Sequence, residues 1–126
     1  MTGPNWKLED DLETVTLTLP TNPPATLRLK LADIEDMLAH LGDFRELMKP
    51  PVPATYAMGQ VFDAVPNPAW VSEPELMQGN SALHIRDPRY GWLHYMLPRE
   101  EAQRLASFLQ KQVDAPHPAA ETGKLN

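Results

Sequence analysis

The chain has 126 residues, 42% of them hydrophobic, carries a net charge of −6 and contains no cysteine. The missing cysteines exclude a disulfide framework, a thiolate zinc site, a cysteine-ligated iron–sulfur cluster and a cysteine nucleophile. The negative charge argues against general binding to nucleic acid or to an anionic membrane, and no apolar run reaches the length of a membrane span. We expect a cytoplasmic protein with one domain over residues 1–113 and flexible ends at 1–12 and 114–126.

Two short segments near the amino terminus alternate strictly between polar and apolar residues. They cover residues 14–19 and 26–31, and period two is typical of half-buried strands. Three prolines lie between them and cannot donate ladder hydrogen bonds, so a hairpin is expected. The apolar face of this hairpin would carry Val15, Leu17, Leu19, Leu27, Leu29 and Leu31.

The hydrophobic period then changes to three and four residues, which predicts an amphipathic helix. Its apolar stripe consists of Leu31, Ile34, Met37, Leu38, Leu41, Phe44, Leu47 and Met48. Acidic residues occupy the first turns, and Pro50 and Pro51 end the run. A stripe of this size should be buried by docking on a sheet.

Prolines interrupt the next segment, in which we expect two short strands, at about 60–65 and 69–77. The residues from Pro66 to Pro68 are typical of a turn and would join these two strands. Pro74 has no N–H to donate, which favours an edge strand or a bulge for the second.

A second hairpin is expected from residues 81–87 and 91–97, with residues 87–91 as the connector. Pro98 suits the first position of a following helix. The apolar stripe of that helix would be Ala102, Leu105, Ala106, Leu109 and Val113.

Together these elements predict an α+β fold in the order β-β-α-β-β-β-β-α. We expect one antiparallel sheet of five or six strands with both amphipathic helices packed on one face. A hairpin running into a helix occurs twice, which indicates either a repeat of one unit or a common supersecondary arrangement without shared ancestry.

The second hairpin concentrates the residue types that carry chemistry. The candidate binding residues are His84, Arg86, Arg89, Tyr90, Trp92 and His94. If Asp87 pairs with Gly91, then His84 lies opposite His94 and Arg86 opposite Trp92, so that four side chains share one face. A connector longer by one residue would place His84 opposite Tyr95 instead.

Four interpretations of this cluster are open. A metal site would need a third ligand besides the two imidazoles, from Glu73 or Glu75. Arginines beside aromatic rings could bind a carboxylate, phosphate or nucleotide, in a binding protein or an enzyme. The same residue types are enriched at protein interfaces. The last interpretation is an ordinary solvated face, with Asp87 bonding only its own turn.

The charge of the chain is unevenly distributed. Residues 1–80 carry twelve acidic and five basic side chains, whereas residues 81–126 carry five and six, so an anion-facing surface should lie in the second part. The acidic residues on the polar face of the first helix could instead mimic nucleic acid and bind a basic partner. More often such residues simply form the solvent-exposed face of an amphipathic helix. These residues are Asp33, Glu35, Asp36, Asp43 and Glu46.

No complete catalytic set is visible in the sequence. Phosphate-binding, zinc-protease, nucleophile-elbow and calcium-loop motifs are absent, and no serine is placed beside both a histidine and an acid. We therefore expect an accessory or adaptor domain without catalysis, metal or cofactor. It would bind another protein, or a second copy of itself, through the second hairpin and its neighbouring edge strand.

Overall fold

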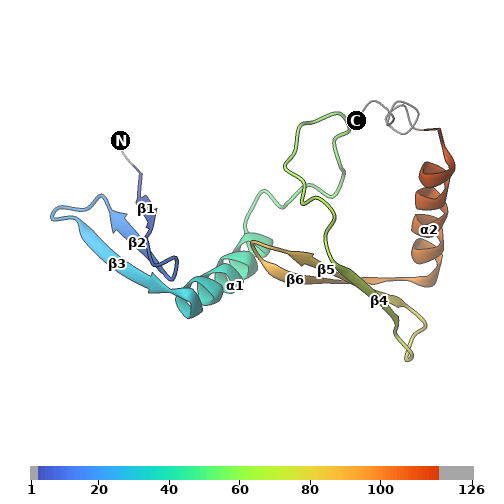
Figure 1. The fold of residues 1–126 in the computed structure, drawn as a ribbon, viewed down its shortest axis with the longest axis horizontal. Helices are drawn as coiled ribbons and strands as arrows, with labels where there is room; N and C mark the ends of the chain where they lie inside the picture. Colours follow the sequence, from blue (N-terminus) through green and yellow to red (C-terminus); the bar gives the residue numbers. More distant parts are fainter. Residues whose placement is uncertain (1–2, 117–126) are drawn as a thin grey trace. The chain divides into compact units, whose positions relative to one another are not determined.

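Two sheets, each followed by a helix, make up the computed structural model of this chain (Figure 1). The structure describes residues 3–116 and divides the chain into two units, Met1–Phe62 and Asp63–Asn126. Each unit contains a three-stranded antiparallel sheet and one helix. The fold is thus α+β, but the expected single sheet of five or six strands is wrong.

The first sheet consists of β1 (Asn5–Leu8), β2 (Thr14–Leu19) and β3 (Ala25–Lys30), in that order. Strands β2 and β3 form the hairpin that the alternation predicts, and its apolar residues share one face, since Val15 pairs with Leu29 and Leu17 with Leu27. Strand β1 was not expected, because it lies in the segment assigned to a flexible end. It pairs with β2 and places Trp6 opposite Leu17, which is only 6% exposed.

Helix α1 (Leu31–Leu47) begins directly after β3, as the change of period predicts. The carboxylate of Asp33 accepts the backbone N–H of Lys30 at 2.9 Å and so caps the first turn. No loop residue separates strand from helix, whereas such connections usually have a few. The helix therefore continues away from the sheet rather than folding back across it (Figure 1), and its stripe stays open, with Leu47 81% exposed.

Residues 48–69 contain no strand, so the strand expected at about 60–65 is wrong. Val61 in this segment is fully exposed, and Phe62 contacts the Tyr56 ring of the same loop rather than a strand. A short apolar segment forms a strand only where another strand can accept its hydrogen bonds. The expected element order fails at two points for these reasons: β1 is added and the strand before Pro66 is missing.

The second sheet has the order β4-β5-β6, with β4 at Trp70–Pro74, β5 at Ser81–Asp87 and β6 at Gly91–Leu97. The bounds of β5 and β6 are those expected from the sequence. Strand β4 is an edge strand that ends at Pro74, which confirms the interpretation of that proline.

The loop after β4 is ordered by a side chain that the sequence pattern did not single out for this role. The Glu75 carboxylate accepts the backbone N–H groups of Met77 and Gln78, and Gly79 provides the left-handed turn at φ 76°.

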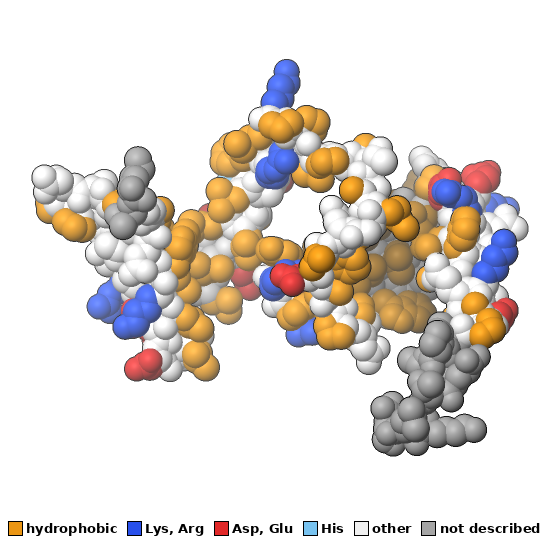
Figure 2. Space-filling view, turned by 90° about the horizontal axis from the view of Figure 1, so that it is seen from above, with side chains coloured by type: hydrophobic (Ala, Val, Ile, Leu, Met, Phe, Trp, Pro, Cys, Tyr) orange, Lys and Arg blue, Asp and Glu red, His pale blue; other side chains and the backbone are white. Residues whose placement is uncertain are grey.

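Helix α2 (Arg99–Asp114) follows Pro98 and includes the predicted stripe. No helix in residues 3–116 is long and apolar enough to cross a membrane. The flexible end expected at 114–126 lies almost wholly outside the described residues, which stop at 116. Many hydrophobic side chains, orange in Figure 2, lie at the surface.

Candidate functional site

The two faces of the second sheet differ in chemistry. Asp87 pairs with Gly91, Arg86 with Trp92 and His84 with His94, which is the first of the two registers considered from the sequence. The side chains of two paired residues lie on the same face of a sheet. Residues two positions further along either strand also lie on that face. The histidine face, as we call it, consists of Val71, Glu73, Ala82, His84, Arg86, Trp92, His94 and Met96.

The two histidines of this face contact each other. His84 Nδ1 lies 2.8 Å from His94 Nδ1, and the ring planes meet at 70°. Only one proton fits between two nitrogens at this distance, so one ring donates and the other accepts. On its other side, His84 Nε2 lies 3.4 Å from Oε1 of Glu73, a residue of the edge strand β4. A row of three polar side chains thus crosses the sheet.

Arg89 and Tyr90, two of the predicted site residues, belong to the turn rather than to this face. The Asp87 carboxylate accepts the backbone N–H of Arg89 at 2.7 Å and that of Tyr90 at 3.3 Å. It also accepts a hydrogen bond from the Arg89 guanidinium, whose Nη2 lies 3.2 Å from Oδ2 of Asp87. The guanidinium lies over the Tyr90 ring. The expectation that Asp87 bonds its own turn is confirmed, and Arg89 is already occupied by that carboxylate.

The charges of this turn stabilise each other. The guanidinium of Arg89, and then its backbone N–H, lower the pKa of Asp87 below its usual range. The hydrogen bond to the Asp87 carboxylate in turn raises the pKa of Arg89. The turn is therefore held by a charged pair that stays charged in neutral solution.

The opposite face of this sheet forms an apolar cleft with α2. Its volume is about 520 Å³, and it is lined by Trp70, Leu83, Ile85 and Leu97 from the sheet and by Leu105 and Leu109 from the helix. Sequence reasoning missed this cleft. The alternation of the strands and the stripe of α2 do identify its walls, but the space between them depends on the angle at which the helix leaves β6.

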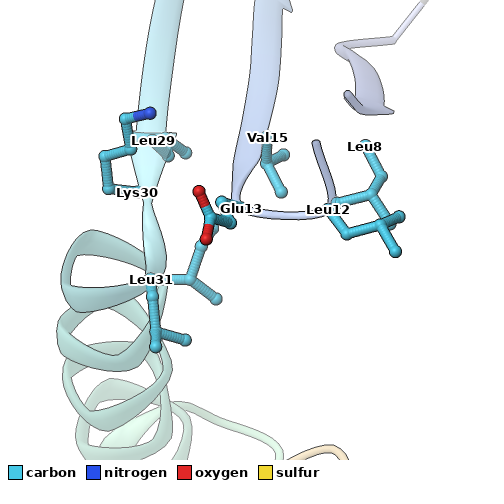
Figure 3. A pocket seen from close by; sticks show the side chains of 8 residues that line it. Leu8, Leu12, Glu13, Val15, Leu29, Lys30 and Leu31 are labelled. Atoms are coloured by element: carbon cyan, nitrogen blue, oxygen red, sulfur yellow. The ribbon is translucent and has the colours of Figure 1, made fainter. Parts of the chain in front are cut away.

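Two further clefts lie elsewhere. One, of about 460 Å³ in the first unit, is surrounded by Leu8, Leu12, Val15, Leu29 and Leu31, with the charged Glu13 among them (Figure 3). A second, of about 380 Å³, lies between the loop after β4 and the start of α2. None of the three clefts is lined by His84, Arg86 or His94. The anion-binding hypothesis, which required these three side chains to converge in a concave pocket, gains no support from these clefts and stays a prediction.

Local contacts bear on the metal-site and acidic-mimicry hypotheses. Within the described residues no group of three or more histidine and acidic side chains is arranged to hold a metal. Glu75, one of the two suggested third ligands, is used by its own loop. On α1, Asp33 caps the helix and Asp36 lies 3.5 Å from His40, so two of the five acidic residues proposed to mimic nucleic acid have local roles.

Comparisons with known proteins add no function to this geometry. No protein-family model, no curated protein and no solved structure matches the chain.

Proposed function

We propose that this chain is a non-enzymatic accessory domain that binds another protein through its histidine face. The observation that carries the proposal is the pairing of Trp92 with Arg86 on adjacent strands of one ordered hairpin. Both are residue types that dominate binding energy in protein interfaces, and the ladder fixes their backbones before binding.

The surroundings of this pair suit a protein partner. Trp92 is 45% exposed, and Val71 and Met96 on the same face are also exposed. Tryptophan and methionine supply apolar contact area, while an arginine at the centre or the rim selects a carboxylate. We therefore expect the partner to offer an apolar pocket for the indole and an acidic side chain for Arg86.

The test is the double variant Arg86→Ala/Trp92→Ala, compared with the wild type in quantitative capture of partner proteins. Arg89 is left intact because its removal would strip the Asp87 turn of its charged partner. Trp6→Ala is the matched control, since Trp6 is a similarly exposed strand tryptophan of the first sheet. A partner held by the wild type and the control but lost from the double variant supports the proposal.

Capture of every partner by the double variant at wild-type levels would contradict it. A second copy of the chain is one partner that this experiment can identify. In that case the wild type and the Trp6 variant form a dimer in analytical ultracentrifugation, and the double variant sediments as a monomer.

We also infer that the two units follow one plan and that the protein acts in the cytoplasm. Three antiparallel strands run into a helix in each unit, with a tryptophan in the first strand and no loop longer than one residue before the helix. The absence of cysteine supports a reducing compartment. Imaging of the tagged full chain tests the location.

A further inference from the structure

The first unit leaves open two apolar surfaces of the kind that usually cover each other. One is the leucine face, as we call it, of the first sheet, which carries Leu8, Val15, Leu17, Leu27 and Leu29. The other is the apolar stripe of α1. A helix commonly packs its stripe on the apolar face of a neighbouring sheet. Here α1 begins directly after β3 and continues away from the sheet, so it does not cover the leucine face of its own chain (Figure 1).

The two surfaces meet where β3 passes into α1. The cleft of about 460 Å³ at this junction is lined by Leu8, Val15 and Leu29 of the leucine face and by Leu31 and Ile34, the first residues of the stripe (Figure 3). Leucine face and stripe therefore open to the same side of the unit. A second copy, turned about a two-fold axis through this cleft, brings its stripe onto this sheet and its sheet onto this stripe.

The dimensions of the two surfaces suit this exchange. Helix α1 has 17 residues and is about 25 Å long, and β2 and β3 have six residues each and are about 20 Å long. Three strands at a spacing of about 4.8 Å also match the diameter of one helix, which is about 10 Å. One helix can thus lie along one sheet and cover most of its leucine face.

The exposed apolar area agrees with what a stable dimer needs. Six large side chains of the combined surface are exposed, namely Leu8, Leu27, Leu31, Leu38, Leu41 and Phe44. At roughly 200 Å² for a fully open side chain of this size, they present on the order of 650 Å². A stable interface buries about 800 Å² on each partner, and a little over half of that is nonpolar. One copy therefore offers enough apolar area for one side of a dimer.

From this geometry we propose that the chain forms a two-fold dimer in which α1 of each copy lies on the leucine face of the other. The occupant is a second copy because only reciprocal pairing covers both surfaces at once. A single foreign helix on the sheet would leave the stripe of α1 open. The contact lies within the first unit and does not use the histidine face.

Sedimentation of the full chain over a range of concentrations tests the dimer. The wild type should sediment at twice the mass of one chain, and Leu41→Glu should sediment as a monomer because it places a charge in the stripe. Leu47→Glu is the matched control and should stay dimeric, since Leu47 lies about 120° around the helix from Leu41. A monomeric wild type, or a dimeric Leu41→Glu variant, would overturn the proposal.

Cross-linking of the cysteine-free chain tests the arrangement without a charged variant. Leu27 lies three residues before the end of β3 and Leu38 seven residues after the start of α1, so each is about 10 Å from the junction. Two differently tagged chains, one with Leu27→Cys and one with Leu38→Cys, should therefore form a disulfide when mixed and oxidised. Leu47→Cys in place of Leu38→Cys is the control, and equal yields from both mixtures contradict the arrangement.

The Arg86→Ala/Trp92→Ala variant separates this dimer from the contact proposed for the histidine face. It should stay dimeric in sedimentation even if it loses every captured partner. A dimeric wild type with a monomeric Arg86→Ala/Trp92→Ala variant would place the self-contact on the histidine face instead, and it would refute the pairing through α1.

Discussion

The turn that joins β1 to β2 and the turn that joins β5 to β6 use the same device in different settings. Asp11 accepts the backbone N–H groups two and three residues ahead, of Glu13 and Thr14, as Asp87 does in the second unit. The Asp11 carboxylate also accepts a hydrogen bond from the Thr14 hydroxyl, whose oxygen accepts one from Lys30 Nζ. The Asp87 carboxylate instead accepts a hydrogen bond from the Arg89 guanidinium. One aspartate therefore shapes each turn, and the surrounding residues decide what else it binds.

The faces that these turns serve also differ. The first sheet places leucines and Trp6 on one side, with threonines and charged residues on the other. The second sheet keeps an apolar side against α2 but fills the other with histidines, an arginine and a tryptophan. The two sheets thus each have an apolar side and differ in the chemistry of the other side.

The largest expected effect comes from Leu17→Ala, because Leu17 is the one large hydrophobic side chain that is buried within the described residues. Truncating a buried leucine costs about 2–4 kcal/mol of unfolding free energy. Urea unfolding followed by amide exchange should show this loss in the first sheet. Leu47→Ala, at an exposed position at the end of α1, should change the unfolding free energy by less than about 0.5 kcal/mol. Equal losses for both variants would contradict the packing of the first sheet.

Two glycine variants should change stability in opposite directions. Gly91 has φ 83° in the second hairpin, so Gly91→Ala should cost about 1–2 kcal/mol of unfolding free energy. Gly42 lies inside α1, and a Cβ added there would meet no atom within 4 Å, so Gly42→Ala should stabilise the chain by about 0.5–1 kcal/mol. Thermal unfolding measures both. A stabilising Gly91→Ala would disprove the left-handed turn and the register that depends on it.

Acid should weaken both aspartate turns. The pKa of Asp11 is lowered first by the Glu13 N–H, and that of Asp87 first by the Arg89 guanidinium. A folded-state pKa below the unfolded value of about 3.9 gives stability that is present above that value and is lost as the pH falls through the lowered pKa. Asp11→Asn and Asp87→Asn should each flatten the fall of unfolding free energy below about pH 4.

That fall is measured by denaturant titration at each pH. Asp10→Asn provides the control, because Asp10 has no such turn contact among the hydrogen bonds of the first turn. A wild-type slope that persists in the Asp11→Asn/Asp87→Asn double variant would show that other carboxylates cause it.

The smallest expected effect is on α1. The backbone carbonyl of Asp36, and then its carboxylate, raise the pKa of His40. The resulting stability is fully present below the ordinary pKa of about 6.5 and is lost as the pH rises through the raised value. Histidine titration by nuclear magnetic resonance should show this raised pKa, and Asp36→Asn should lower it. An unchanged titration would exclude the Asp36 carboxylate as a cause and leave its backbone carbonyl.

Local patterns determined most of the secondary structure. Strict alternation located β2 and β3, two seven-residue runs located β5 and β6, and the change to a helical period located α1 and α2. Pro74 correctly marked the edge of the second sheet. These features are predictable because each depends on side chains and backbone groups that are close in sequence.

The sequence by itself therefore determined the α+β class, the two helices and both hairpins, and it left two registers open for the histidines. Only the tertiary structure decided that there are two sheets, that residues 5–8 add a strand, that Arg89 is bound by Asp87 and that the two Nδ1 atoms meet at 2.8 Å. Strand pairing and the distance between side chains on different strands depend on contacts distant in the chain, which local periodicity does not encode.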